Sequence, residues 1–447
     1  MQIENWKNNT KTFIYENDQV ITYSQLYEDL RNLQEKLRAK FPTRHAFLVE
    51  AENTYSLYLK NLALLELGHI VFPSPTYQFQ DEAFRQFVHD ETGIRFVLWP
   101  KNFTVDQLSG DIIEVSSEVL KEYRVPKTGL FIVRTSGSSG RKFKLVLHDY
   151  QKFLKKYQTI GAHFRKTFAF SPAESIAGME TVLEALSHQA ELIVAGDRLS
   201  PAQVLELLSR YQVDYFQTTP TFLNLLATSG QVAGKDLSAL KKIAYGSEPA
   251  QLPVLKSLKK SLPQIEFMHT YGMSEIGIQK TFTNQEDPSV FRLDMAVNPA
   301  RLVDGMVQVQ SLTPLICYLN EPEMPMDGNW FKTFDVANVE SEYWRVVGRT
   351  GDLINLAGRK FFPSEVESLI LEMDEVQDAT VIKETNDFIG NILIAKIVIS
   401  EDLTEQEFLK KFKEFCEKRV PFYMHPHKTI ISKEANISTR FKKIRKS

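Results

Sequence analysis

Short apolar runs alternate with amphipathic helical stretches through most of this chain, and that alternation limits the folds open to it. Residues 46–50 (AFLVE) and 129–134 (GLFIVR) have the apolar pattern of buried strands. Residues 55–68 repeat apolar positions at helical spacing and end at a glycine. Residues 201–210 follow a serine and open with a proline, which is typical of a helix N-terminus. The pattern predicts an α/β fold with mostly parallel sheets.

The pattern changes near residue 330. Residues 329–336 and 342–349 predict a pair of short strands. Beyond them we expect a small α+β unit with a helix over 364–373, strands over 378–383 and 391–400, and a helix over 404–418. We place the domain boundary at Gly351, which gives a large N-terminal domain (1–350) and a small C-terminal domain (351–447).

Composition excludes several classes of protein. Hydrophobic residues make up 43% of the 447 residues, enough for a large core, so wholesale disorder is excluded. The net charge of −3 argues against a nucleic-acid partner. Two cysteines, Cys317 and Cys416, cannot form a disulfide framework. The first residues carry no apolar leader and no apolar stretch could span a bilayer, so we expect a cytoplasmic protein with no integral membrane association.

A loop rich in glycine and hydroxyl groups follows the apolar strand 129–134. It reads Thr135-Ser136-Gly137-Ser138-Ser139-Gly140, and Arg141, Lys142 and Lys144 come after it. Glycines let the backbone turn its N–H groups inward, and hydroxyl groups add donors, so the loop suits a polyphosphate. It is not a Walker A motif, because the glycine spacing differs and no Gly-Lys-Ser/Thr follows. The alternative interpretation is a surface turn.

Two further patterns combine aromatic, glycine and charged residues. Tyr271-Gly272-Met273-Ser274-Glu275 offers a stacking face, a close backbone approach and a carboxylate ligand for Mg²⁺, although a strand end and turn would look the same. Asp335 could accept hydrogen bonds from a ribose diol, and Arg349 could bind phosphate or ribose oxygens. The alternative for this second pair is a solvated β-hairpin with an ion pair.

Taken together and in this order, these segments resemble the adenylate-forming superfamily of acyl- and aryl-CoA ligases, luciferases and peptide-synthetase adenylation domains. The resemblance covers nearly the whole chain, through to a C-terminal Lys443. It implies that residues 1–350 bind ATP and an acid and that residues 351–447 form a mobile lid. It also implies two half-reactions: a carboxylate attacks the α-phosphate of ATP to give an acyl-adenylate, and a thiol then displaces AMP.

The resemblance implies a role for each matching residue. The 135–140 loop would hold the β- and γ-phosphates, with either Lys142 or Lys144 beside it. The remaining assignments are Gly246-Ser247-Glu248-Pro249 and Tyr271-Gly272 at the adenine, Ser274 at the α-phosphate, Glu275 on Mg²⁺, Asp335 and Arg349 on the ribose, Gly358 and Lys360 at the thiol site, and Lys443 at the α-phosphate and the acid.

The chain also departs from the family pattern at four places. Phe143 stands where a lysine is usual after the phosphate loop, and Lys442 replaces the glycine before the C-terminal lysine. Thr333-Phe334-Asp335 replaces Thr-Gly-Asp, and Ser175-Ile176-Ala177-Gly178 replaces the His-x-x-Gly of many acyl-CoA ligases. These departures bear on the phosphate contacts and on the acid pocket, and they leave Glu275, Asp335, Arg349 and Lys443 in place.

The leading hypothesis is an AMP-forming acid–thiol ligase that uses ATP, Mg²⁺ and CoA. A stand-alone enzyme that loads the phosphopantetheine thiol of an acyl carrier protein is the second, and a non-catalytic nucleotide-binding relative is the third. We expect the acid to contact residues 171–180, 216–221 and 276–277. These are mostly small or apolar, which favours a fatty or aryl acid, while Glu174 keeps an amino acid open.

Overall fold

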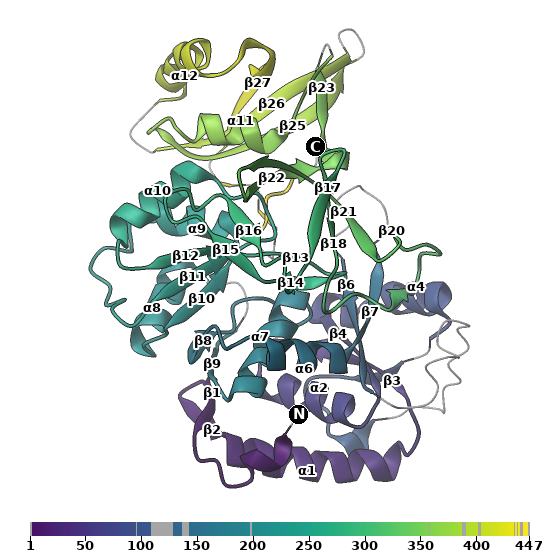
Figure 1. Cartoon of the computed structure of the whole chain (residues 1–447). Coiled ribbons are helices and arrows are strands. Elements are labelled where there is room, and N and C mark those ends of the chain that lie inside the picture. The colour runs from purple at the N-terminus through teal and green to yellow at the C-terminus, as the bar shows by residue number, and fades with distance from the viewer. Residues whose placement is uncertain are drawn as a thin grey trace.

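The structure is a computed structural model that describes the whole chain except residues 1, 95, 109–127, 136–142, 197–198, 357, 387–389, 401–403, 433, 436, 439–440 and 446–447. A large N-terminal part carries a small C-terminal part on one end, and the N-terminus lies at the opposite end (Figure 1). The α/β architecture predicted from the sequence is confirmed. Among the described residues, no helix has the length and apolar content needed to cross a membrane.

The first large sheet is parallel except at one edge and carries residues 216–218, part of the 216–221 stretch predicted to contact the acid. Its strand order is β12 (Glu266–His269), β11 (Lys242–Tyr245), β10 (Tyr215–Thr218), β8 (Lys166–Phe168), β9 (Glu191–Val194), β1 (Thr12–Glu16) and β2 (Gln19–Thr22), with only the β1–β2 pair antiparallel. Three helices pack on it through one apolar cluster: α8 (Pro201–Arg210), α9 (Pro220–Thr228) and α10 (Leu252–Ser261). The helix predicted over 201–210 is confirmed, and the Ser200 side chain caps it.

The second large sheet leads into the predicted phosphate loop. Its order is β19 (Cys317–Tyr318), β7 (Leu145–Asp149), β6 (Leu130–Arg134), β4 (Ile70–Pro75), β3 (Ala46–Ala51) and β5 (Val97–Trp99). The strands from β6 to β5 are parallel, and β7 runs antiparallel to β6. The helices beside the two sheets are η1 (Ile3–Trp6), α1 (Tyr23–Lys40), α2 (Tyr55–Glu66), α3 (Thr76–Phe79), α4 (Glu82–Thr92), η2 (Val105–Gln107), α6 (Tyr150–Thr159) and α7 (Ile176–His188).

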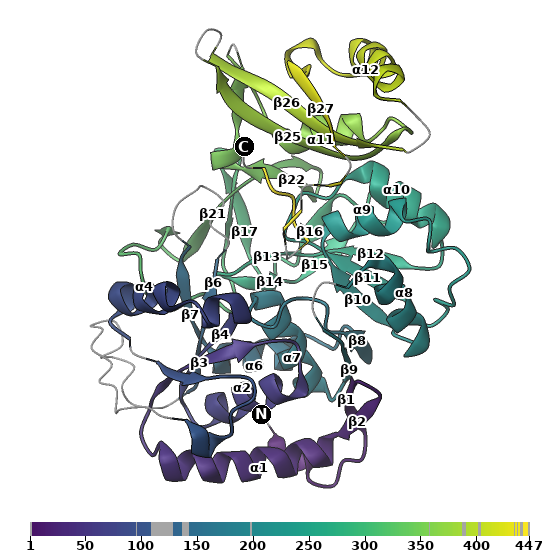
Figure 2. The same cartoon turned by 180° about the vertical axis from the view of Figure 1, so that it is seen from behind.

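A third, antiparallel sheet lies between these two sheets and the C-terminal part (Figures 1 and 2). It contains β15 (Thr281–Thr283), β16 (Phe291–Leu293), β22 (Tyr343–Arg349), β21 (Trp330–Glu340), β18 (Met306–Val309) and β17 (Ala300–Val303), with β20 (Met326–Asp327) paired to β21. The predicted strand pair near 330–349 is its centre. A separate two-stranded hairpin, β13 (Tyr271–Met273) and β14 (Gly277–Gln279), carries the Tyr-Gly motif.

The C-terminal part has its own apolar cluster, built from residues 354–424. Its elements are η3 (Thr350–Asp352), β23 (Ile354–Leu356), β24 (Arg359–Phe361), α11 (Pro363–Ile370), β25 (Val376–Asn386), β26 (Gly390–Ile399), α12 (Glu405–Arg419), η4 (Phe422–Met424) and β27 (Lys428–Ser432). β25 and β26 are antiparallel, and β27 joins β26 in parallel. The predicted helices and strands of this small α+β domain are confirmed, although the first helix ends three residues earlier than expected.

Candidate active site

Tyr271, Asp335 and Arg349, which lie far apart in the sequence, form one hydrogen-bonded cluster. β21 and β22 place Asp335 opposite Arg349 in the antiparallel register. The Tyr271 hydroxyl donates to Asp335 Oδ2 at 2.8 Å, and Arg349 Nε donates to Asp335 Oδ1 at 3.1 Å. Burial raises the pKa of Asp335, and Arg349 and the Tyr271 hydroxyl offset part of that rise. The hairpin and the ion pair considered as alternatives therefore exist, and they bring the predicted ribose and adenine residues together.

Phe334 explains why a glycine suits this place in the Thr-Gly-Asp motif. Its φ is +62°, in the left-handed region that glycine adopts readily and other residues adopt at a cost. The Phe334 ring is 42% exposed, so burial of the ring offsets little of that cost. The turn nevertheless delivers Asp335 to Tyr271 and Arg349, which means that the Phe334 substitution does not displace the carboxylate.

Glu275 lies two residues after the end of β13 and is buried, with one oxygen bound by the Tyr318 hydroxyl. The Tyr318 hydroxyl donates to Glu275 Oε1 at 3.1 Å, and Lys144 Nζ lies 4.4 Å from the centre of the Tyr318 ring. Burial raises the pKa of Glu275, and Arg349, Tyr318 and Lys144 oppose this. A buried carboxylate with one oxygen left for a further contact is suited to Mg²⁺, which is usually held by one or two carboxylates together with substrate phosphates.

The structure describes the residues at both ends of the predicted phosphate loop, Thr135 and Lys144. Thr135 N donates to Lys144 O at 3.0 Å, and Lys144 N donates to Thr135 Oγ1 at 3.1 Å. The hydrogen bonds close the loop at its base beside Tyr318. Ser136, Gly137, Ser138, Ser139, Gly140 and Lys142 lie outside the described residues, so their assignment to the phosphates stays a prediction. Lys144 lies over the ring of Tyr318, whose hydroxyl binds Glu275, so this lysine is linked to Glu275 through Tyr318.

Gly246 follows β11 directly, where the chain passes close to Thr270. A Cβ at this position would lie 2.4 Å from Thr270 O and 2.5 Å from Thr270 Oγ1. We expect Gly246→Ala to destabilise the protein by about 1–3 kcal/mol, since the clash is with backbone that cannot move freely. Differential scanning calorimetry measures this as a lower melting temperature. Gly161→Ala, where a Cβ meets nothing within 4 Å, is the matched control and is expected to leave the melting temperature nearly unchanged.

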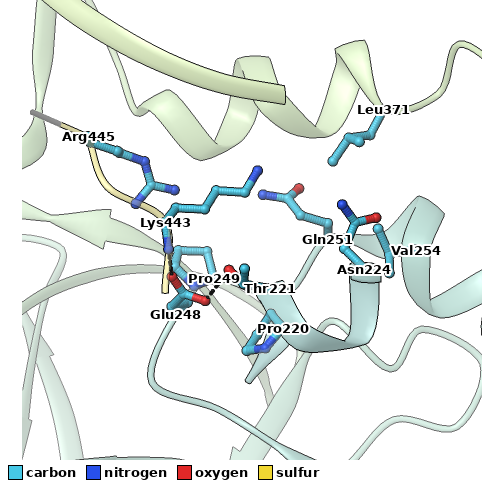
Figure 3. Close-up of a pocket in the computed structure, with 10 residues that line it drawn as sticks. All are labelled: Pro220, Thr221, Asn224, Glu248, Pro249, Gln251, Val254, Leu371, Lys443 and Arg445. Carbon is cyan, nitrogen blue, oxygen red and sulfur yellow. Dashed lines mark hydrogen bonds between the residues drawn. The ribbon is translucent and has the colours of Figure 1, made fainter. Parts of the chain in front are cut away.

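The predicted adenine segment also borders a pocket between the two domains (Figure 3). Glu248 accepts a hydrogen bond from the Thr221 hydroxyl at 2.6 Å and another from the backbone N–H of Lys443 at 2.7 Å. Arg445 from the same C-terminal tail lines the pocket, whose full lining is Pro220, Thr221, Asn224, Glu248, Pro249, Gln251, Val254, Leu371, Lys443 and Arg445. The tail therefore reaches back from the C-terminal domain to the N-terminal domain.

Lys443 contacts the predicted nucleotide region through its backbone, while its side chain turns to the C-terminal domain. Its Nζ lies 3.2 Å from Asp378 Oδ1 and 3.8 Å from Glu367 Oε2, and it donates to the carbonyl of Ala379. Arg445 binds the same Glu367 at 2.9 Å. In this arrangement the Lys443 ammonium group serves as a buried ion-pair partner, and its predicted contact with the α-phosphate needs a different side-chain direction.

The tail is anchored in the N-terminal domain by Phe441. Its ring stacks on Phe170 at 5.3 Å and meets Phe222 edge-on at 4.9 Å between ring centres. The Phe441 carbonyl accepts a hydrogen bond from Thr219 at 2.6 Å. Asn224 adds a link from α9 to the C-terminal domain by donating to Asp378 Oδ1 at 3.0 Å. The short segment 441–445 thus packs an aromatic ring on the N-terminal domain and forms ion pairs with the C-terminal domain.

We expect the contribution of Glu367 to stability to be lost in acid. Burial favours the neutral acid, but Lys443 and Arg445 outweigh it and hold the pKa of Glu367 at about 2, below its ordinary value of 4.5. A lowered pKa stabilises the folded state above pH 4.5, and this stabilisation disappears as the pH falls towards 2. The melting temperatures of the wild type and Glu367→Gln should therefore differ at pH 7 and converge on acidification. Glu372→Gln, which removes an exposed ion pair with Arg419, should change little at any pH.

The other predicted site residues lie apart from this cluster or contribute backbone. Ser274 lies next to Glu275, and its carbonyl is bound by His148 Nε2 at 2.6 Å. Ser247 is exposed with a φ of +71°. Gly358, with a φ of +82°, and Lys360 are exposed on the β23–β24 hairpin of the C-terminal domain. Their assignment to the thiol site stays a prediction.

The sequence did not predict the contacts by which three side chains support the Tyr-Gly motif, although Glu180 ends the 171–180 stretch predicted to contact the acid. Tyr318 binds Glu275, His148 binds the Ser274 carbonyl, and Glu180 binds the backbone N–H of Ile278 at 2.6 Å. Each comes from an element distant in sequence, so no local spacing could have marked it. The one available signal was the presence of polar residues, such as His148 and Glu180, within otherwise apolar segments.

The family models of known proteins match this chain over both domains. The model described as AMP-binding enzyme matches residues 2–304, and the model described as AMP-binding enzyme C-terminal domain matches residues 365–442. The chain belongs to the AMP-binding enzyme family. The resemblance inferred from the motifs is therefore confirmed, and the small C-terminal domain has a counterpart of its own in the family.

Individual relatives are distant. The chain is 25% identical to 4-coumarate–CoA ligase 2 of Oryza sativa subsp. japonica, over 58% of this chain and 49% of that protein. It is 21% identical to the mitochondrial medium-chain acyl-CoA ligase ACSF2 of Macaca fascicularis, over 84% of this chain and 73% of that protein. The chain thus spans about half the length of the 4-coumarate–CoA ligases that it matches.

The fold is shared with solved structures of ligases. The anthranilate CoA ligase AuaEII, in complex with anthranoyl-AMP, has a TM-score of 0.80 at 17% identity and covers 98% of this chain and 94% of its own. The o-succinylbenzoate coenzyme A synthetase of Bacillus subtilis, in complex with ATP and magnesium ion, has a TM-score of 0.73 at 17% identity, covering 99% and 98%. At this identity the likeness establishes the fold of the whole chain.

Proposed function

We propose that this protein is an AMP-forming acid–thiol ligase that activates a carboxylic acid with ATP and transfers the acyl group to CoA. The observation that carries the proposal is the cluster in which Tyr271 and Arg349 hold the two oxygens of Asp335 beside the buried Glu275. A ribose diol could donate to the outer lone pairs of Asp335. Membership of the AMP-binding enzyme family and the CoA ligase names of its relatives support the same reaction.

The residues would divide the first half-reaction between binding and charge neutralisation. Tyr271 would pack against adenine, Asp335 and Arg349 would hold the ribose, and Glu275 would hold Mg²⁺. The metal ion would neutralise phosphate charge. The acid carboxylate would then attack the α-phosphorus, pyrophosphate would leave, and the Lys443 ammonium group would stabilise the charge that develops on the α-phosphate. Little covalent chemistry falls to the protein, so the rate depends on how these groups are placed.

We propose an aryl or other apolar acid as the substrate. Aromatic rings gather beside the stretches predicted to contact the acid: Phe216, within 216–221, lies 5.3 Å from Phe170, and Phe170 lies 4.6 Å from Phe222 between ring centres. Glu180, the buried carboxylate at the end of the predicted 171–180 stretch, is already paired with Lys156 and is unsuited to hold a substrate amino group. Several relatives are named for aromatic acids, which agrees with this choice.

The decisive experiment incubates the protein with ATP, Mg²⁺, CoA and a panel of aryl, fatty and amino acids, and detects acyl-CoA by mass spectrometry. The expected result is an acyl-CoA and AMP from one or more apolar acids. Adding a phosphopantetheinylated carrier protein in competition with CoA tests the alternative acceptor. Release of AMP without any CoA adduct across the whole panel would rule out CoA as the acceptor.

A further inference from the structure

The β13–β14 hairpin that carries the Tyr-Gly motif has an outer edge that two buried side chains cover. On this edge the N–H of Ile278 donates to Glu180 Oε1 at 2.6 Å, and Lys156 Nζ donates to the carbonyl oxygen of Ile278 at 2.6 Å. A third strand would normally pair with such an edge. Here a carboxylate binds the N–H and an ammonium group binds the C=O of the same residue, Ile278, so charge-assisted hydrogen bonds occupy the edge.

The two side chains also form an ion pair within the N-terminal domain. Lys156 comes from α6 and Glu180 from α7, and their side chains are 6% and 1% exposed. The Tyr157 hydroxyl donates to Glu180 Oε2 at 2.6 Å. Desolvating two charges costs about as much as their attraction returns, and apolar residues often serve a core equally well. Stability alone is therefore a weak reason for an ion pair at this position.

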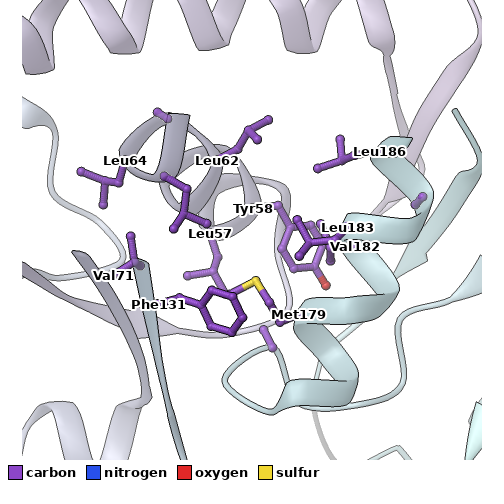
Figure 4. Packing of buried hydrophobic residues seen from close by; sticks show 14 of the residues in the cluster. Leu57, Tyr58, Leu62, Leu64, Val71, Phe131, Met179, Val182, Leu183 and Leu186 are labelled. Atoms are coloured by element: carbon purple, nitrogen blue, oxygen red, sulfur yellow. The ribbon is translucent and has the colours of Figure 1, made fainter. Parts of the chain in front are cut away.

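The backbone of α7 is fixed from its other side. Met179, Val182, Leu183 and Leu186 pack against α2 in the apolar cluster shown in Figure 4. Because this packing sets the rotation of α7, Glu180 is directed from an adjoining face of the helix towards α6 and β14. The position of the carboxylate is thus determined by the core rather than by the hairpin that it binds.

Gly277 shows how closely the carboxylate approaches the hairpin. Its φ is +69°, and a Cβ there would lie 2.6 Å from Glu180 Oε1 and 2.6 Å from Thr313 Oγ1. Thr313 and Ser311 in turn donate to the carbonyl of Ile276, at 2.9 and 2.6 Å. The backbone that follows Glu275 is therefore held at successive residues by side chains of the surrounding core.

We infer that Lys156 and Glu180 are positioning residues, which set the backbone of β14 and thereby place Glu275 and Tyr271 for nucleotide and Mg²⁺ binding. This inference rests on the proposed function for the identity of the ligand. His148 holds the carbonyl of Ser274 at 2.6 Å on the other side of Glu275. The segment is anchored at both ends, so the Glu275 carboxylate is presented by a fixed backbone.

The test uses Glu180→Gln, Lys156→Met and the double variant Lys156→Met/Glu180→Gln in the full chain. Each single variant leaves one buried charge without its partner and should lower the melting temperature, whereas the double variant removes both charges and should recover much of it. Calorimetric titration of ATP at increasing Mg²⁺, without any acid, then measures binding independently of turnover. We expect the double variant to need about 10–100-fold more Mg²⁺ for half-maximal ATP binding, the range found when groups that orient metal ligands are removed.

Hydrogen exchange supplies a readout that needs no ligand. Peptides covering residues 271–279 should exchange faster in the double variant than in the wild type, because the Ile278 N–H has lost its carboxylate acceptor and the Ile278 carbonyl its ammonium donor. Glu184→Gln is the matched control: Glu184 lies one turn further along α7, is also buried, and accepts its hydrogen bonds from His163, which is not part of β14. It should leave both the Mg²⁺ dependence and the exchange of 271–279 unchanged.

The outcomes separate the inference from the proposed function. A double variant with wild-type Mg²⁺ dependence and wild-type exchange would overturn the inference and leave the pair a structural element only. If the wild type binds ATP with Mg²⁺ but forms no acyl-adenylate with any acid, the proposed ligase function fails, while the altered binding and exchange of the double variant would still support positioning. A control variant that changes as much as the double variant would also count against it.

Discussion

Lys443→Ala is expected to lower acid-dependent ATP–pyrophosphate exchange by about 10²–10³, the loss seen when one stabilising group is removed from a developing anion. The physical reason is that the ammonium group would neutralise charge at the α-phosphate during acid attack. Isotope exchange between ATP and labelled pyrophosphate measures the first half-reaction directly. Binding of ATP alone should fall much less, because adenine and ribose contacts do not involve Lys443.

Arg445→Ala is the control that separates chemistry from structure. Both residues pair with Glu367, so both variants should lower the melting temperature. Only Lys443→Ala should lower exchange by about 10²–10³, since Arg445 has no predicted contact with the phosphate. Wild-type exchange in Lys443→Ala, or equal losses in the two variants, would contradict a catalytic role for Lys443 and leave it as an ion-pair residue.

Glu275→Gln is expected to lower the same exchange by about 10²-fold at a fixed low Mg²⁺ concentration, because an amide oxygen cannot replace a charged ligand to a hard cation. Gln is close to Glu in shape and keeps an oxygen for the Tyr318 hydroxyl, so the fold should persist. Measuring exchange over a range of Mg²⁺ concentrations should show a higher half-saturating value for the variant.

Tyr318→Phe provides the comparison for Glu275. It removes the hydrogen bond to Oε1 but leaves the carboxylate in place, so its effect on the Mg²⁺ dependence should be several-fold smaller than that of Glu275→Gln. If Glu275→Gln showed the Mg²⁺ dependence of the wild type, Glu275 would not be a ligand and the metal would need other donors. Among the described residues no group of three His, Cys, Asp or Glu side chains offers that alternative.

The sequence predicted the parts of the candidate site whose residues lie close together along the chain. Tyr271 and Glu275 lie within five residues, and Asp335 and Arg349 lie on one hairpin, so their order along the chain preserves their grouping. The strands of the first two sheets were also predictable, because buried parallel strands are continuous apolar runs. The third sheet was mostly missed, since strands such as 281–283 and 306–309 are short and include polar residues.

What the sequence could not supply is the set of contacts made by residues distant along the chain. Glu180 and Ile278 are 98 positions apart, and Tyr318 and Glu275 are 43 positions apart. Their proximity depends on how α7 and β19 pack in the folded chain. The direction of the Lys443 side chain is likewise a tertiary outcome, set by Glu367 and Asp378 rather than by any pattern in the tail.

The packing of Phe441 against Phe170 and Phe222 has a thermodynamic consequence for the proposed lid. If the lid turns between the two half-reactions, the ring must leave Phe170 and Phe222 and meet water. Hydrating apolar surface raises the heat capacity, so the balance between the two lid orientations should vary with temperature along a curve rather than a straight van't Hoff line. Phe441→Ala should make the van't Hoff plot of the lid equilibrium less curved, because less apolar surface is exposed when the tail leaves its site. The curvature would then report whether the tail is packed on the N-terminal domain.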